Sequence, residues 1–143
     1  MSIDPSAASI LQAVFGTGLL TFAMAGWMGA TRLPAMRRAG LKLQAAAHTA
    51  DLRDRLPSSA RRISDNYNNL FEAPTVFYAV ALGILAAGLA DPIHAACAWI
   101  FLIARVAHSL VQATVNLVPL RLVFFVISWT AVGVMVVRAL MAL

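Results

Sequence analysis

Residues 70–115 read LFEAPTVFYAVALGILAAGLADPIHAACAWIFLIARVAHSLVQATV, and this stretch decides the fold. It contains two apolar runs, 70–90 and 93–115, each close to the roughly 20 residues that a helix needs to cross a bilayer core of about 30 Å. Asp91 and Pro92 between them form a compact helix start, because an aspartate can cap a helix and proline lacks the N–H that would be unpaired there. The stretch predicts two antiparallel membrane-spanning helices joined by a short turn.

Two more apolar runs flank this hairpin, at about 7–31 and 120–143. Of the 143 residues, 61% are hydrophobic and only 12% are charged, which is far from the composition of a soluble or nucleic-acid-binding domain. The first run is too long for a cleavable signal, and no Lys or Arg precedes it. We therefore expect one all-α domain over residues 1–143, an integral membrane four-helix bundle with antiparallel spans.

Basic residues gather between the first two spans. Segment 32–65 holds eight of the eleven Lys and Arg residues and three of the six acidic ones, and so accounts for the whole net charge of +5. The positive-inside rule places this loop in the cytoplasm and both chain termini on the opposite side. With Lys42 as the only lysine, the Ala- and Arg-rich composition is typical of a bacterial inner membrane.

The loop itself contains helix-forming sequence. An Ala-rich stretch, 41–56, can form a helix that Pro57 stops, and Ser58 or Ser59 can cap another. Nothing prevents this second helix from running straight into the second span. Pro74 removes a backbone donor and frees the carbonyl of Leu70, so a kink is expected beside Glu72.

Polar side chains interrupt the second and third spans. Three of them are spaced three and four residues apart and share one face of the third span: Arg105, His108 and Gln112. Asn69 and Glu72 share a face of the second span. At 1.5 Å per residue from the Asp91 turn, the two groups lie at nearly the same depth. They predict a polar cleft in the cytoplasmic half of the bilayer.

Glu72 and Arg105 are each expensive to bury alone, so we expect them to face each other. The pair is compatible with a structural clamp between helices or with a ligand site. Arg32, at the inner end of the first span, and Arg121 flank the same level. They are compatible with interfacial anchors, or with a net positive cluster that suits a carboxylate or thiolate ligand.

Three motifs, Asn69-Leu-Phe-Glu72, Arg105-Val-Ala-His108 and Pro119-Leu-Arg121, resemble those of the MAPEG family, membrane-associated proteins in eicosanoid and glutathione metabolism. The resemblance extends over the whole chain, including four spans and a long loop after the first. It implies a homotrimer that holds glutathione between neighbouring subunits in the cytoplasmic half. It also implies that certain residues line or brace the glutathione site: Arg32, Asn69, Glu72, Arg105, His108 and Arg121. Arg121 would stabilise the glutathione thiolate.

Some positions depart from the family pattern. Asp65 and Asn68 stand where arginines are found in the family, Gln112 stands where a tyrosine is common, and Leu122 replaces a serine. A carboxylate at position 65 would repel the carboxylates of glutathione. Arg61 and Arg62, one or two turns earlier, are candidates to substitute for the missing arginines.

The expected function is that of a membrane-embedded glutathione-binding protein, acting as a transferase or peroxidase on lipophilic electrophiles from the bilayer. The alternative is a non-catalytic membrane scaffold or lipid-binding protein, which the altered arginines favour. A four-span exporter with Glu72 as proton site is disfavoured, because Glu72 has an expected arginine partner and lies near the inner edge.

The remaining candidates point to no further chemistry. Cys97 is the only cysteine, so no internal disulfide is possible, and it is expected to pack in the helix bundle. His48 and His94 are expected as solvated or interfacial side chains. No metal-ligand spacing, phosphate loop or nucleophile triad is present.

Overall fold

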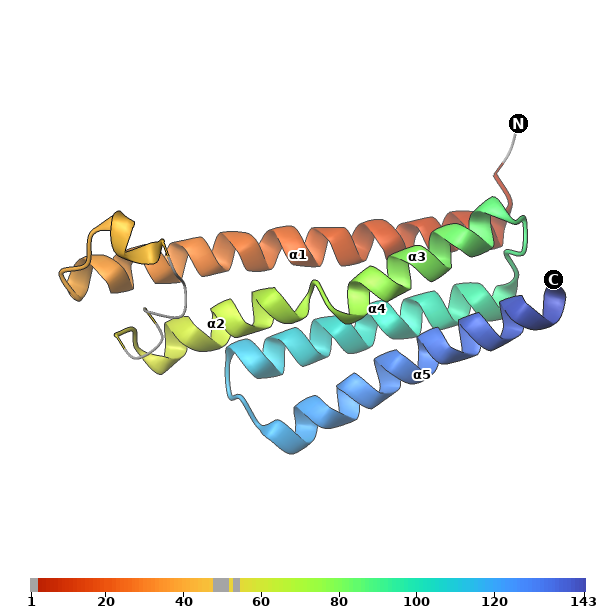
Figure 1. The fold of residues 1–143 in the computed structure, drawn as a ribbon. Helices are drawn as coiled ribbons and strands as arrows, with labels where there is room; N and C mark the ends of the chain where they lie inside the picture. Colours follow the sequence, from red (N-terminus) through yellow and green to blue (C-terminus); the bar gives the residue numbers. More distant parts are fainter. Residues whose placement is uncertain (1–2, 48–51, 53–54) are drawn as a thin grey trace.

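The computed structural model describes residues 3–47, 52 and 55–143. Within these ranges the chain forms only helices, drawn in Figure 1: α1 (Pro5–Arg38), the short 3₁₀ helix η1 (Leu43–Ala46), α2 (Ser58–Asn69), α3 (Ala73–Ala86), α4 (Pro92–Ala113) and α5 (Val118–Ala142). Four segments are long and apolar enough to cross a membrane, namely α1, α2 with α3 as one span, α4 and α5. The predicted all-α four-helix bundle is confirmed, and successive spans run antiparallel (Figure 1).

Helix α4 lies at the centre of the bundle, between α1 and α5 in Figure 1. Twelve of its 22 residues are buried, against four of 25 in α5. Phe77 of α3 stacks on Phe101 of α4 with ring centroids 4.2 Å apart, and Ile10 and Met135 belong to the same buried cluster. Cys97 lies in this cluster too, as expected from packing. This apolar core fills the half of the bundle that contains the Asp91 turn.

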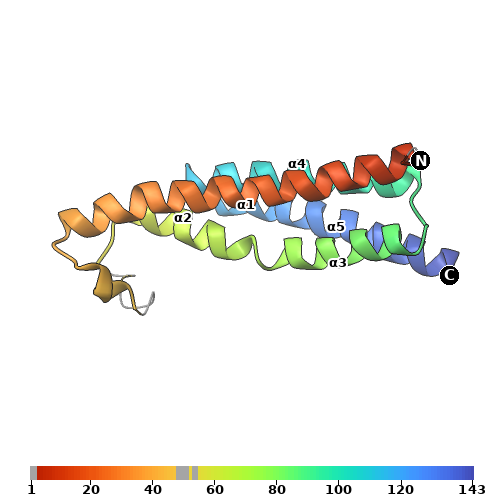
Figure 2. The same cartoon turned by 90° about the horizontal axis from the view of Figure 1, so that it is seen from above.

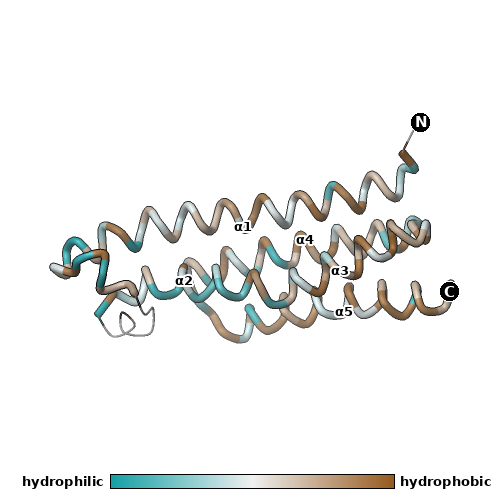
Figure 3. Tube along the Cα trace, turned by 45° about the horizontal axis from the view of Figure 1, so that its top comes forward, coloured by the Kyte–Doolittle hydropathy of each residue, from teal (hydrophilic) through white to brown (hydrophobic). Residues whose placement is uncertain are grey.

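The opposite end of the bundle is polar. Figure 3 shows hydrophilic residues gathered where α1 ends and around α2, while the other end is mostly hydrophobic.

Helix α1 continues to Arg38, seven residues past the predicted span end at 31, although Pro34 lies inside it. Hydropathy marks where the apolar side chains stop, whereas the backbone can stay helical beyond that point. The basic segment therefore begins on a helix rather than in a loop.

The predicted helix over 41–56 is only partly visible. The structure has η1 within it, and residues 48–51 and 53–54, including His48, lie outside the described residues. Met36 of α1 packs with Leu52 and Leu56 in a small buried cluster. This contact holds the described parts of the segment against the end of α1.

A break separates α2 from α3 where a continuous helix with a kink was predicted. Figure 2 shows the chain leaving its helical path there. Leu70 and Phe71 donate their N–H groups to carbonyls three residues back, and Glu72 has φ −93° and ψ −91°, outside the helical region. Pro74 contributes because it has no N–H and its ring clashes with the Leu70 carbonyl. The expected distortion beside Glu72 is present and is larger than a kink.

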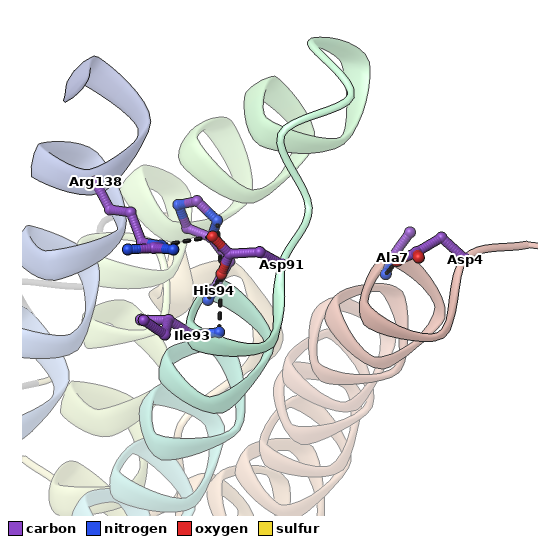
Figure 4. Close-up of polar contacts among 6 residues, drawn as sticks. All are labelled: Asp4, Ala7, Asp91, Ile93, His94 and Arg138. Carbon is purple, nitrogen blue, oxygen red and sulfur yellow. Dashed lines mark hydrogen bonds and ion pairs between the residues drawn. The ribbon is translucent and has the colours of Figure 1, made fainter. Parts of the chain in front are cut away.

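The turn before α4 is fastened by Asp91, shown in Figure 4. Its Oδ1 accepts the N–H groups of Ile93 at 2.8 Å and His94 at 2.9 Å, and its Oδ2 accepts from the Arg138 guanidinium of α5. Burial of the carboxylate by itself raises the pKa of Asp91, but the His94 N–H and Arg138 outweigh it. The pKa therefore lies below its ordinary value of 3.8.

The expectation that His94 would be solvated or interfacial is wrong. Its side chain is only 1% exposed, and its Nδ1 lies 3.4 Å from Asp91 Oδ1. The reason is helical phase: His94 lies four and seven residues before Ala98 and Phe101, which are both in the core. A histidine one turn after a cap is buried when that face of the helix is buried.

We expect Asp91→Asn to keep the helix cap, because an asparagine oxygen also caps, but to lose the charge-assisted bond to Arg138. The cost should be at most about 1 kcal/mol, the range for exposed ion pairs. Because the fold lowers this pKa, the stabilisation is present above 3.8 and is lost as the pH falls through the lowered value. Thermal unfolding in detergent at neutral and strongly acidic pH measures the difference between the two proteins. A gap that persists at acidic pH would contradict this assignment.

Candidate functional site

The break between α2 and α3 opens beside a pocket of about 330 Å³ at the polar half of the bundle. Helices α4 and α5 supply its other walls. The lining residues are Asn69, Glu72, Ala73, Arg105, His108, Val118, Arg121, Leu122 and Phe125. Five residues predicted from the sequence as site residues therefore meet in one pocket.

Arg105 is the most deeply buried of these residues, with a side chain only 1% exposed. Its Nη2 donates to the backbone carbonyl of Asn69 at 3.0 Å. The predicted ion pair with Glu72 is not formed, which corrects the sequence analysis: Glu72 lines the same pocket but its side chain is exposed. The physical reason is the break after α2, because it leaves the Asn69 carbonyl accessible to the guanidinium.

Gln112 connects the polar residues behind the pocket. Its side-chain amide is 3.0 Å from Asn69 Nδ2 and 3.2 Å from His108 Nε2, and His108 Nδ1 is 3.0 Å from the Arg121 carbonyl. Nδ1 must donate to that carbonyl. A neutral imidazole that donates from Nδ1 must accept a hydrogen bond at Nε2. This bond forms if the oxygen and nitrogen of the Gln112 and Asn69 amides are exchanged. The Gln112 nitrogen then donates to His108 Nε2 and to the Asn69 oxygen, and every contact is satisfied.

Arg121 lies in the first turn of α5, where it is held by Asn116. Its Nη1 donates to Asn116 Oδ1 at 2.8 Å, while its Nε is buried and has no partner within the described part of the chain. Asn116 has φ 54°, a left-handed conformation that asparagine tolerates better than most residues. Asn116 was not predicted as a site residue, although an asparagine between two helices is a signal for such a turn.

Two predicted site residues do not line this pocket. Gln112 is buried behind it and acts only through its hydrogen bonds. Arg32 lies on α1 and is not among the residues that line this pocket. The structure thus joins Asn69, Glu72, Arg105, His108 and Arg121 directly.

The pocket suits an anionic molecule that lies beside an apolar group. Two guanidiniums and one carboxylate line the pocket, so its charge is net positive, and three apolar side chains of α5 border them: Val118, Leu122 and Phe125. Arg105 Nε and Arg121 Nε are buried donors that no described residue accepts. Such donors favour a bound acceptor. No group of three or more His, Cys, Asp or Glu residues that could hold a metal ion occurs in the described ranges.

One of three comparisons with known proteins gives a match. No curated protein and no solved structure matches the chain significantly. A sequence model of the MAPEG family matches residues 10–141, nearly the whole chain. That family includes glutathione-dependent transferases and related proteins, and its members are generally oligomers embedded in membranes. With four membrane-spanning helices in the expected order and a family match from end to end, this chain belongs to the MAPEG family.

Proposed function

We propose that this protein binds glutathione in the pocket between α2, α4 and α5 and acts as a transferase or peroxidase on lipophilic electrophiles. The observation that supports this most is the meeting of Arg105 and Arg121 with an apolar wall in one pocket. Family membership supports the choice of glutathione as the anionic ligand. Glutathione would supply the nucleophilic or reducing thiol.

The residues present fit such a ligand. Glutathione has two carboxylates, an amino group and a thiol, and the pocket offers guanidinium donors together with the exposed carboxylate of Glu72. A free thiol has a pKa of about 8.5, so it must be lowered for the thiolate to form at neutral pH. Arg121 is the residue we assign to that task, because its Nε has no partner among the described residues and Asn116 fixes its position. Asn69, Glu72 and His108 would bind and orient the peptide. Arg105 would hold Asn69 in place from the buried side of the pocket, through its hydrogen bond to the Asn69 carbonyl.

Electrophiles would arrive from the bilayer side. Leu122 is 59% exposed and Phe125 is 40% exposed, and both line the pocket. In a membrane these side chains would contact lipid tails or a dissolved apolar molecule. An apolar substrate could therefore reach the thiol without crossing water.

A homotrimer would complete this site. The outer face of α1 exposes large apolar residues, including Phe15, Leu19 and Phe22, and α1 of one subunit could cover the pocket of the next. Arg32 on the same helix would then reach the glutathione of a neighbour, which would explain why it does not line the pocket of its own protomer. We further propose that the basic end lies in the cytoplasm of a bacterium, with both termini across the inner membrane.

A non-catalytic scaffold or lipid-binding protein is the second candidate. Asn69, His108, Gln112 and Arg105 hydrogen-bond to one another or to backbone, which suits a purely structural network. Asp65 lies one turn before Asn69 on α2 and would repel a carboxylate. Stabilisation by lipids but never by glutathione would select this alternative.

We expect glutathione to raise the unfolding temperature of the detergent-solubilised protein saturably, because it binds only the folded state. Arg121→Ala should weaken binding by about ten- to a hundredfold, the usual worth of a hydrogen bond to a charged group. Arg37→Ala is the matched control. Arg37 is an exposed arginine in the last turn of α1 and does not line the pocket. The proposal fails if no shift occurs at millimolar glutathione, or if both variants lose it equally.

Asn116 should act as a positioning residue for Arg121. Asn116→Gly keeps the left-handed backbone but removes the acceptor that holds the guanidinium. The pH at which bound glutathione becomes a thiolate, read from its ultraviolet absorbance, should rise toward about 8.5 in Arg121→Ala and by a smaller amount in Asn116→Gly. A purely structural role would lower the stability of Asn116→Gly without moving this pH midpoint.

A further inference from the structure

A second recess, separate from the pocket above, lies where the start of α2 meets the link between α4 and α5. It has a volume of about 370 Å³ and is lined by Ser58, Arg61, Arg62, Asp65, Val115 and Asn116. This is the basic end of the bundle, at the level where α4 ends and the chain turns back toward the membrane. A recess in this position would face the headgroup layer of a bilayer.

Two guanidiniums and one carboxylate line the recess, so its charge is net positive, and an anionic ligand must lie on the arginine side, away from Asp65. Arg61 and Arg62 lie four and three residues before Asp65 on α2, yet within the described residues neither forms an ion pair with it, and Asp65 is exposed. The recess is also next to the start of α2, which no side chain in the described part of the chain caps. The unpaired N–H groups of that first turn add partial positive charge.

Arg62 is held in place before any ligand binds. Its Nη1 donates to the carbonyl of Thr114 at 2.6 Å, at the end of α4. Its Nε is buried without a partner among the residues described. Asn116 uses its oxygen to hold Arg121, so its amide NH₂ group is left as a donor at the recess. The recess therefore offers fixed donors together with the more freely placed guanidinium of Arg61.

Apolar side chains border these donors on the membrane side. Val115 lines the recess and is 61% exposed, and Leu117 and Val118 beside it are exposed too. A molecule that fills both parts must have an anionic head and apolar chains. A free phosphate compound would satisfy only the donors and would leave the apolar border uncovered.

We propose that this recess binds the phosphate group of an anionic phospholipid, with the acyl chains lying along Val115 and Leu117. Bidentate guanidinium contacts suit phosphate oxygens, and arginines at a membrane surface attract anionic lipid. The site takes its ligand from the bilayer and does not depend on glutathione binding.

The test compares lipid retention and unfolding temperature for the full-length protein in nanodiscs of phosphatidylcholine, with and without phosphatidylglycerol. Phosphatidylglycerol should stabilise the wild type and be retained in native mass spectra. Arg61→Gln should weaken retention about fivefold, from the contribution of one arginine near a membrane surface. The double variant Arg61→Gln/Arg62→Gln should weaken it further, and Arg61→Lys should restore most of it.

The matched control is Arg37→Gln/Arg38→Gln, which removes the same charge from the same end of the bundle but outside the recess. Equal loss in both double variants would overturn the proposal, because it would indicate general attraction to the surface. Arg61→Gln remains informative if the double variant does not fold, since no hydrogen bond of the Arg61 side chain is found in the described structure.

Two further arms distinguish the source of the ligand. Inorganic phosphate in lipid-free detergent, at matched ionic strength, should give little stabilisation. A saturable phosphate shift that Arg61→Gln abolishes, with no added effect of lipid, would assign the recess to a free phosphate compound. Arg61 and Arg62 line this recess and not the glutathione pocket, so they do not replace the missing arginines there, and glutathione affinity should be unchanged in Arg61→Gln. If it falls while lipid retention does not, the recess belongs to the glutathione site and the lipid proposal is wrong.

Discussion

A guanidinium enclosed in an apolar bundle needs acceptors from within the protein, and Arg105 obtains one from the backbone of Asn69. That carbonyl is accessible because α2 ends there; in a regular helix it would be engaged by the N–H four residues later. The break caused in part by Pro74 therefore has two effects. It supplies an acceptor to the buried arginine, and it leaves Glu72 exposed in the lining of the pocket instead of buried in the core.

The parts of the fold that depend on local sequence could be predicted. The hairpin around Asp91 follows from a capping aspartate and a proline between two apolar runs, and the polar face of α4 follows from residues three and four apart. These two facts already bring Arg105 and His108 opposite Asn69. Most of the residues of the candidate site could therefore be predicted from the sequence.

The rest depends on geometry that spacing does not contain. Pairing Glu72 with Arg105 assumed a nearly continuous helix, and the depth of the break changed the partner of the arginine. The end of α1 was placed by hydropathy, which does not report that the backbone stays helical past Pro34. The burial of His94 could have been found from its phase with Phe101, but only once that face of α4 was known to be buried.

The link between α4 and α5, residues 114–117, has a role that its small size conceals. The carbonyl of Thr114 holds Arg62 and the side chain of Asn116 holds Arg121. Two arginines from different helices are therefore positioned by hydrogen bonds to one short turn. Surface loops usually accept insertions and deletions at little cost. Here a single inserted residue would rotate one acceptor relative to the other and misplace both guanidiniums. The length of this link is therefore constrained as strictly as a core position, although its side chains are largely exposed.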